Sequence, residues 1–124
     1  MNILKFEELL AWQEARKLTR DIYRLSFNPP LSNDFGLKDQ VRRPAASIML
    51  NIAKGFGGNS DQQFIQFLNY AQRSCSETQS ILYICLDNNY INQPDFDLFY
   101  AQLKTIRKLC FGLIKYLKQP KPTD

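Results

Sequence analysis

The sequence contains no histidine among its 124 residues. That absence excludes Ser-His-Asp and Cys-His catalytic arrangements, and it excludes every metal site that needs an imidazole ligand, such as the Glu-x-x-His sites of di-iron bundles. No nucleophile with a nearby general base is visible either. The sequence therefore predicts no enzyme, no metal site and no cofactor.

Long hydrophobic runs are missing as well. No apolar stretch approaches the roughly 18 residues needed to span a bilayer. The first eight residues, MNILKFEE, lack the basic start and apolar core of a signal peptide. We therefore predict a soluble, cytoplasmic protein with no membrane partner.

Cysteine occurs at only three positions, Cys75, Cys85 and Cys110, each within an apolar helical pattern. Cys75 and Cys85 are separated by about 15 Å along one helix, which is too far for a disulfide. The thiols are expected to be free, buried and kept in a reducing compartment.

The remaining composition is that of one globular domain. Hydrophobic residues make up 44% and charged residues 23% of a 14.5 kDa chain. The formal charge of +4 and the pI near 9.0 are compatible with a polyanionic partner such as RNA or DNA, but they do not require one.

Four stretches carry apolar residues at three- and four-residue steps, which predicts helices over about 6–27, 35–56, 61–88 and 94–118. The breaks between them contain proline, glycine and asparagine. Helices of this length with short connections bury their apolar faces together as an all-α, antiparallel up-down-up-down four-helix bundle. We assign the bundle to residues 1–118 and predict a disordered tail over 119–124.

The second helical stretch contains Pro44, which predicts either a kink or a new helix starting at the proline. The glycine-rich exit at 55–58 does not resemble a phosphate loop, because no strand precedes it and no Lys-Ser/Thr pair follows. Gln40, Ser47 and Asn51 share one polar line of this helix, which inter-helix hydrogen bonding explains better than catalysis.

Basic residues are concentrated on the first two helices. Arg16, Arg20 and Arg24 follow one another at four-residue steps and therefore share one line on the outside. They form either a solvated face, with Lys17 and Asp21 as an ion pair, or a stripe that contacts phosphates. The candidate nucleic-acid-binding residues are Arg16, Arg20, Arg24, Lys38, Arg42 and Arg43.

The antiparallel arrangement also predicts which residues lie side by side. Counting outward from Pro29 places Arg16 beside Arg43. Counting outward from Asn59 places Arg43 near Glu77, where the two side chains can form a structural ion pair that fixes the register. In that interpretation the arginines stabilise packing and do not bind a ligand.

A second basic zone lies on the fourth helix, where the cations meet no acid before Asp124. These charges complement the C-terminal end of a helix, or they bind an anion. The residues are Lys104, Arg107, Lys108, Lys115 and Lys118.

The ordered set Trp12-Gln13, Gln40-x-Arg42-Arg43, Ser47-Ile48 and Asn51-Ile52-Ala53-x-Gly55 resembles the four helix bundle proteins related to the 23S rRNA-intervening-sequence proteins. More distantly, it is similar to the accessory variability determinant of diversity-generating retroelements. The resemblance covers nearly the whole chain to about Tyr116.

The resemblance implies a bundle that assembles into a ring-like homopentamer. In the retroelement branch, it implies binding of nucleic acid and a reverse transcriptase through a basic surface. Arg42 and Arg43 occupy the paired-arginine positions of the family, and Glu77 the acid of its third helix. Lys54 stands where family members usually carry glutamate, so any ion pair that used that acid is missing or re-routed here.

Two functions follow from these observations. The first is a non-enzymatic, oligomeric, nucleic-acid-binding accessory factor that contacts phosphates without reading bases. The alternative is a structural or protein-protein interaction module, in which the arginines stabilise helix or subunit packing.

Overall fold

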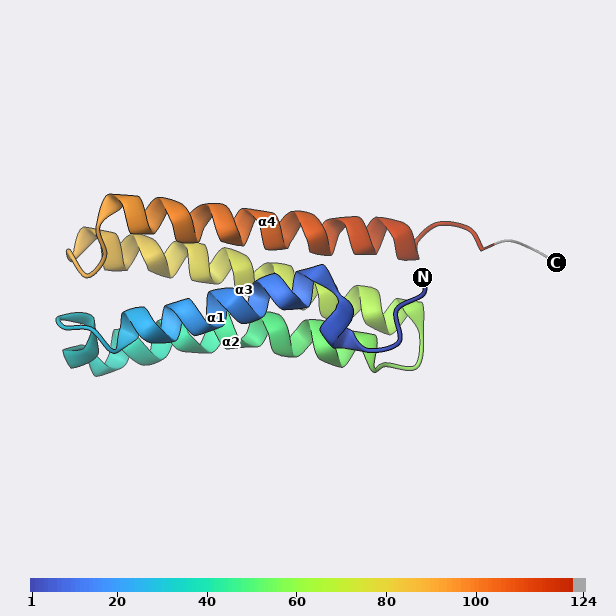
Figure 1. The fold of residues 1–124 in the computed structure, drawn as a ribbon, viewed down its shortest axis with the longest axis horizontal. Helices are drawn as coiled ribbons and strands as arrows, with labels where there is room; N and C mark the ends of the chain where they lie inside the picture. Colours follow the sequence, from blue (N-terminus) through green and yellow to red (C-terminus); the bar gives the residue numbers. More distant parts are fainter. Residues whose placement is uncertain (122–124) are drawn as a thin grey trace.

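The computed structural model describes residues 1–121 and shows four antiparallel α-helices (Figure 1). Short 3₁₀ turns, η1 (Phe6–Glu8) and η2 (Leu31–Asn33), precede the first and second helices. The helices are α1 (Leu10–Ser26), α2 (Phe35–Phe56), α3 (Asp61–Asp87) and α4 (Gln93–Leu117). The predicted up-down-up-down four-helix bundle is confirmed.

The apolar positions at helical spacing form the core. Leu18, Ile48, Leu82 and Ile106 each come from a different helix and are fully buried. Three-residue and four-residue steps place one stripe of each helix inward, and burial of these stripes is the main source of stability. Within the described residues, no helix has the length and apolar character that crossing a membrane requires.

The start of the chain differs from the prediction. A helix was predicted from about Phe6, but α1 begins at Leu10 after an extended residue, Leu9, with φ −73° and ψ 127°. The break lets Phe6 fold back so that its ring packs edge-on against Trp12, with centroids 5.1 Å apart. The Gln13 side-chain amide donates a hydrogen bond to the Glu7 carbonyl at 2.9 Å and holds η1 in place.

Helix α2 runs through Pro44 without interruption, so the alternative of a new helix at the proline is wrong. The Asp34 carboxylate caps its first turn by accepting a hydrogen bond from the Leu37 amide at 3.1 Å. Pro44 itself is buried. Proline has no backbone N–H donor, which weakens the helix at this point. Its buried ring nevertheless contributes to the packing of the core.

Among helices that are neighbours in the bundle, the most extensive packing joins α2 to α3, and the least extensive joins α1 to α4. The Ser74 hydroxyl donates to the Ser47 hydroxyl at 3.0 Å, which confirms an inter-helix role for Ser47. Asn51 hydrogen-bonds within α2, to the Ser47 carbonyl and hydroxyl. Gln40 is exposed and lies outside this small network, so the inter-helix interpretation is confirmed for Ser47 and is wrong for Gln40 and Asn51.

The three cysteines are free and buried, as predicted. Burial raises the pKa of the Cys85 thiol to about 11 and that of Cys110 to about 12, and it also raises the pKa of Cys75. The thiols therefore stay protonated and poorly nucleophilic at neutral pH.

The segment after α4 was predicted to be a disordered tail over 119–124. In its described part, the Lys121 ammonium forms an ion pair with Asp61 at 2.7 Å. The rest of that prediction, at 122–124, lies outside the described residues.

Gly55 is buried near the end of α2, where it allows a close approach of α3. A Cβ atom at this position would lie 2.9 Å from Phe64 Cδ1 and from Phe67 Cβ. We expect Gly55→Ala to lower the free energy of unfolding by about 1–3 kcal/mol because the helices must move apart. Urea unfolding at a fixed protein concentration measures this.

Gly36→Ala is the matched control, because a Cβ there would meet only Asp34 Oδ1 at 3.9 Å. It should leave the unfolding midpoint unchanged or raise it slightly. Equal midpoints for the two variants would contradict the close-packing role of Gly55.

Candidate nucleic-acid interface

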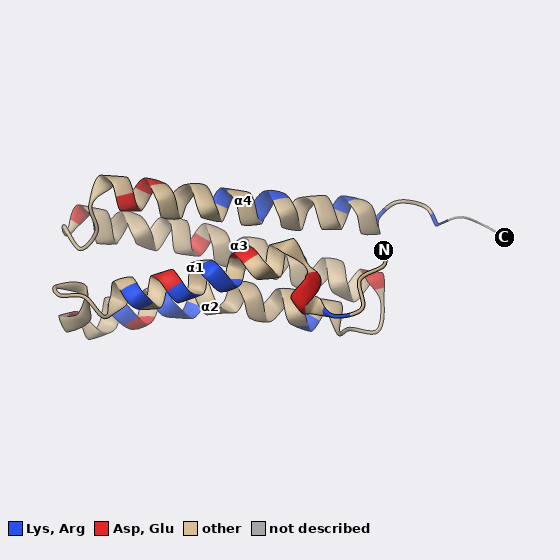
Figure 2. Cartoon of the chain, in the orientation of Figure 1, with Lys and Arg blue, Asp and Glu red and all other residues tan. Residues whose placement is uncertain are grey.

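The predicted arginine line on α1 is present on the outside of the bundle. Arg16, Arg20 and Arg24 are all exposed. Figure 2 shows basic positions close to acidic ones along α1. The line arises because residues four apart lie one above the other on a helix.

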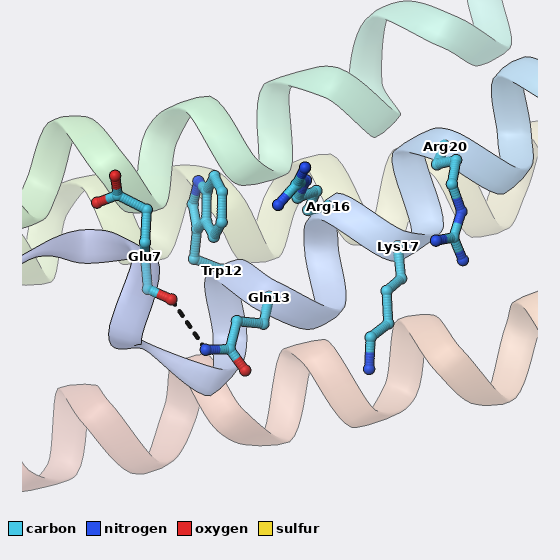
Figure 3. A pocket seen from close by; sticks show the side chains of 6 residues that line it. All are labelled: Glu7, Trp12, Gln13, Arg16, Lys17 and Arg20. Carbon is cyan, nitrogen blue, oxygen red and sulfur yellow. Dashed lines mark hydrogen bonds between the residues drawn. The ribbon is translucent and has the colours of Figure 1, made fainter.

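A depression of about 620 Å³ lies at the N-terminal half of this line (Figure 3). The Arg16 guanidinium lies over the Trp12 ring, 5.8 Å from its centroid. Aromatic surface and cationic groups therefore line the same hollow. The lining residues are Glu7, Trp12, Gln13, Arg16, Lys17 and Arg20.

Sequence reasoning missed four of these lining residues as parts of a site: Glu7, Trp12, Gln13 and Lys17. The spacing held a signal, because Trp12 and Gln13 precede Arg16 and Lys17 by four residues and so lie one turn away. No four-residue spacing of this kind linked Glu7 to the arginines. It reaches the depression only because η1 folds back onto α1 through the Gln13 hydrogen bond.

Nearby acids compensate part of the positive charge on α1. Lys17 pairs with Glu14 at 3.2 Å, not with Asp21 as predicted. Asp21 instead lies 3.1 Å from Arg20 and 3.9 Å from Arg24. In residues 1–121, Arg16 is the arginine of this line that has no ion pair with a carboxylate.

The predicted ion pair between Arg43 and Glu77 is not formed. Arg43 instead pairs with Asp39, one turn earlier on the same helix, at 2.9 Å. The predicted height of Arg43 along α3 was nearly right, because the contact between Ser47 and Ser74 places Arg43 and Glu77 at about the same height in the antiparallel helix pair. Arg43 and Glu77 are nevertheless both exposed, because α2 and α3 pack against each other through other faces.

Arg42 points inward and joins α1 to α2. Its Nε donates to the Ser26 hydroxyl at 2.6 Å, and its guanidinium lies 4.7 Å from the Tyr23 ring centroid and 4.8 Å from that of Phe27. Its Nη2 is buried and has no partner among the described residues. Arg42 therefore stabilises helix packing and does not belong to the outward-facing cations.

The register between α1 and α2 also differs from the prediction. The Thr19 hydroxyl donates to the Ala45 carbonyl at 3.1 Å. Counting from Pro29 had placed Arg16 beside Arg43, so the observed register is shifted by more than one helical turn. The reason is η2, which lengthens the connection beyond the prolines. Arg16 and Arg43 are therefore not neighbours.

Lys38 completes the predicted set and lies near the start of α2. Its ammonium lies 4.9 Å from the Phe35 ring centroid. The structure thus gathers Arg16, Lys17 and Arg20 around one depression, and it leaves Lys38 and Arg43 outside that hollow.

Within residues 1–121, no group of three or more histidine, cysteine or carboxylate side chains is placed to hold a metal ion. The fold and the site together define a small helical-bundle protein with a cationic exterior.

The chain belongs to the 23S rRNA-intervening sequence protein family, whose family model matches residues 7–112. A solved structure of a protein with unknown function from the S23 ribosomal protein family of Bacteroides thetaiotaomicron has the same fold, with a TM-score of 0.79 at 23% sequence identity. The match covers 86% of this chain and 96% of that chain. No curated protein matched the sequence.

Arg42 and Arg43 are adjacent in sequence but should differ in their effect on stability. We expect Arg42→Ala to lower the free energy of unfolding by about 1–3 kcal/mol, because it removes a partly buried hydrogen bond and the stacking on two rings. Arg43→Ala should change it by less than about 0.5 kcal/mol, because exposed ion pairs contribute little. Thermal unfolding of both variants tests this, and equal melting temperatures would contradict the assigned role of Arg42.

Proposed function

We propose that this protein is a non-enzymatic accessory factor that binds nucleic acid through the depression on α1. The observation that supports this most is the combination of Trp12, Arg16, Lys17 and Arg20 around one hollow. Guanidinium and ammonium groups bind phosphate, and an aromatic wall accommodates a sugar or base.

Arg16 is the central residue of this proposal. Because it has no carboxylate partner in the described part of the chain, its charge is available to a phosphate without breaking an ion pair. Phosphate contacts can replace the weak, exposed ion pairs of Lys17, Arg20 and Arg24 at a small cost in free energy. Lys38 and Arg43 add to the positive field from α2.

The proposed contacts go to phosphates and carry no base sequence. Long flexible cations on the outside of a helix position a backbone, and base recognition requires groups that reach base edges. The family is named for an intervening sequence of 23S rRNA, which makes RNA the first ligand to test, with DNA as the comparison.

Binding should weaken linearly with salt on a double-logarithmic plot, because each neutralised phosphate releases a counterion. We expect Arg16→Ala to weaken binding similarly for unrelated RNA sequences and to lower the magnitude of the salt slope by about 1. Fluorescence anisotropy at several salt concentrations measures both quantities.

Lys54→Ala is the control, because it removes the same charge from an exposed position of α2 that does not line the depression. It should affect the slope less than Arg16→Ala. No binding by the wild-type protein at about 50 mM salt would refute the proposed function.

A second candidate role, self-assembly, is favoured by an apolar groove of about 400 Å³ between α1 and α4. Leu10 lines this groove and is 63% exposed, although it is a large hydrophobic residue on a helix. Gly112 also lines it, and a Cβ at that position would meet nothing within 4 Å. Packing within the chain thus gives no reason for a helix-weakening glycine, whereas close approach of a second copy does.

A homo-oligomer, with the pentamer implied by the resemblance as the leading candidate, would bury this groove. A protein partner such as a reverse transcriptase is the competing occupant that the retroelement branch implies. We favour a second copy because the exposed leucine and the open glycine line the same, mostly apolar groove, with Glu8 and Lys108 as its charged lining residues.

We expect Leu10→Lys to lower the mass measured by light scattering, because a charge would be buried in the interface. Leu50→Lys is the matched control, since Leu50 is 53% exposed on α2 and does not line the groove. A monomeric wild-type protein, or unchanged assembly in Leu10→Lys, would argue against this interface.

A further inference from the structure

The Phe111 face is a second cationic surface, which the proposed site on α1 does not include. We define it as the five residues that line a depression of about 330 Å³ between α3 and α4: Gln72, Lys104, Arg107, Lys108 and Phe111. The four residues from α4 follow at steps of three, one and three, so they lie on one side of that helix.

The cations of the Phe111 face are electrostatically uncompensated. Lys104, Arg107 and Lys108 form no ion pair with any carboxylate of residues 1–121. On α1, by contrast, Lys17, Arg20 and Arg24 each have an acidic neighbour. Figure 2 shows the acids of α4 confined to its first turns and the basic positions further along the helix.

The helix dipole does not account for these charges. Helix α4 ends at Leu117, so Lys104, Arg107 and Lys108 lie more than two turns before its end. The dipole effect is confined to the last turn, where Lys115 lies. The cations at the middle of α4 therefore need another explanation.

Arg107 is held in place by a neutral partner. Its Nη1 donates to Gln79 Oε1 at 3.4 Å, and Gln79 is only 6% exposed. The Gln79 Nε2 is buried and has no partner among the described residues. A neutral amide orients the guanidinium without cancelling its charge, so Arg107 keeps its full attraction for an anion.

Phe111 provides the apolar element of this face. Its side chain is 62% exposed, and it makes none of the ring-ring contacts found in the described residues. An exposed ring flanked by cations is the arrangement by which proteins bind single strands: a base stacks on the ring while phosphates contact the cations. Gln72 adds an amide that can hydrogen-bond to a base.

We propose that the Phe111 face binds single-stranded nucleic acid, with one base stacked on Phe111 and neighbouring phosphates contacting Lys104, Arg107 and Lys108. A duplex keeps its bases stacked on each other, so it can use only the cations of this face.

The inference deepens the proposed function, on which it rests for the class of ligand, and it adds a second surface. In the α1 depression the Trp12 ring packs against Phe6 and lies under Arg16, whereas the Phe111 ring has no such contact among the described residues.

The test uses fluorescence anisotropy with a labelled 20-nucleotide single strand, as RNA and as DNA, and with the corresponding duplexes. Phe111→Ala should weaken single-strand binding at least about fivefold and leave duplex binding unchanged. Phe111→Tyr should retain single-strand binding because it keeps a ring.

The double variant Lys104→Ala/Lys108→Ala should weaken the binding of both single strands and duplexes and reduce the salt slope. Because Phe111 is exposed, its replacement should leave the fold intact, and a thermal melt of each variant checks this.

Inorganic polyphosphate serves as a competitor that carries charge but no bases. It should displace the single strand less effectively per phosphate from the wild-type protein than from Phe111→Ala. Equal single-strand affinities of wild-type, Phe111→Ala and Phe111→Tyr proteins would overturn the stacking proposal, as would equal competition by polyphosphate in all three.

Failure of this inference is distinguishable from failure of the proposed function. If Arg16→Ala weakens binding and lowers the salt slope while the Phe111 and Lys104/Lys108 variants bind as wild type, the α1 site stands and the Phe111 face is refuted. If the wild-type protein binds no strand at low salt, both are refuted. A difference between the RNA and DNA arms identifies which single strand this face prefers.

Discussion

The close packing of α2 against α3 is the constraint on which the rest of the structure depends. Gly55 lets the first turns of α3 approach the end of α2, and the Ser47–Ser74 hydrogen bond joins the two helices further along. Small residues at these contacts leave no room for adjustment, because a well-packed core responds to added volume with strain. The pair therefore forms a rigid layer against which α1 and α4 are placed.

Helix α1 packs mainly on α2 and helix α4 mainly on α3, and the two pack less extensively on each other. The seam between them is consequently open, and the apolar groove beside Gly112 lies there. The N-terminal turn η1 is held by the Phe6–Trp12 contact and folds over the start of α1. The least extensive of the contacts between neighbouring helices thus carries the apolar groove proposed for a second copy, whereas the Phe111 face lies between α3 and α4.

Positive charge on this protein falls into three physical classes. Arg42 takes part in helix packing, because a hydrogen bond to Ser26 and the rings of Tyr23 and Phe27 hold its guanidinium between α1 and α2. Arg20, Arg24 and Arg43 form exposed ion pairs that water screens and an anion can exchange. Arg16 and the cations of the Phe111 face have no acidic partner in the described residues. The net charge of +4 hides these differences, because it counts every cation equally.

The sequence by itself determined the four helices, the buried cysteines and the line of arginines on α1, because each depends on residue spacing along one helix. It also determined the antiparallel order, because the connections between the helices are short. It did not determine that Arg42 faces inward, that Arg43 pairs with Asp39 and not with Glu77, or that Trp12 and Gln13 line a depression. The inward position of Arg42 and the missing Arg43–Glu77 pair depend on how far one helix is rotated and shifted against the next, whereas the depression depends on η1 folding back onto α1. The shift is set by η2 and by small residues such as Gly55, and neither has a periodic signal. Only the tertiary structure decided which cations remain available to a ligand, because the packing of the helices places Arg42 between α1 and α2 and leaves Arg43 outside, where its partner Asp39 lies on its own helix.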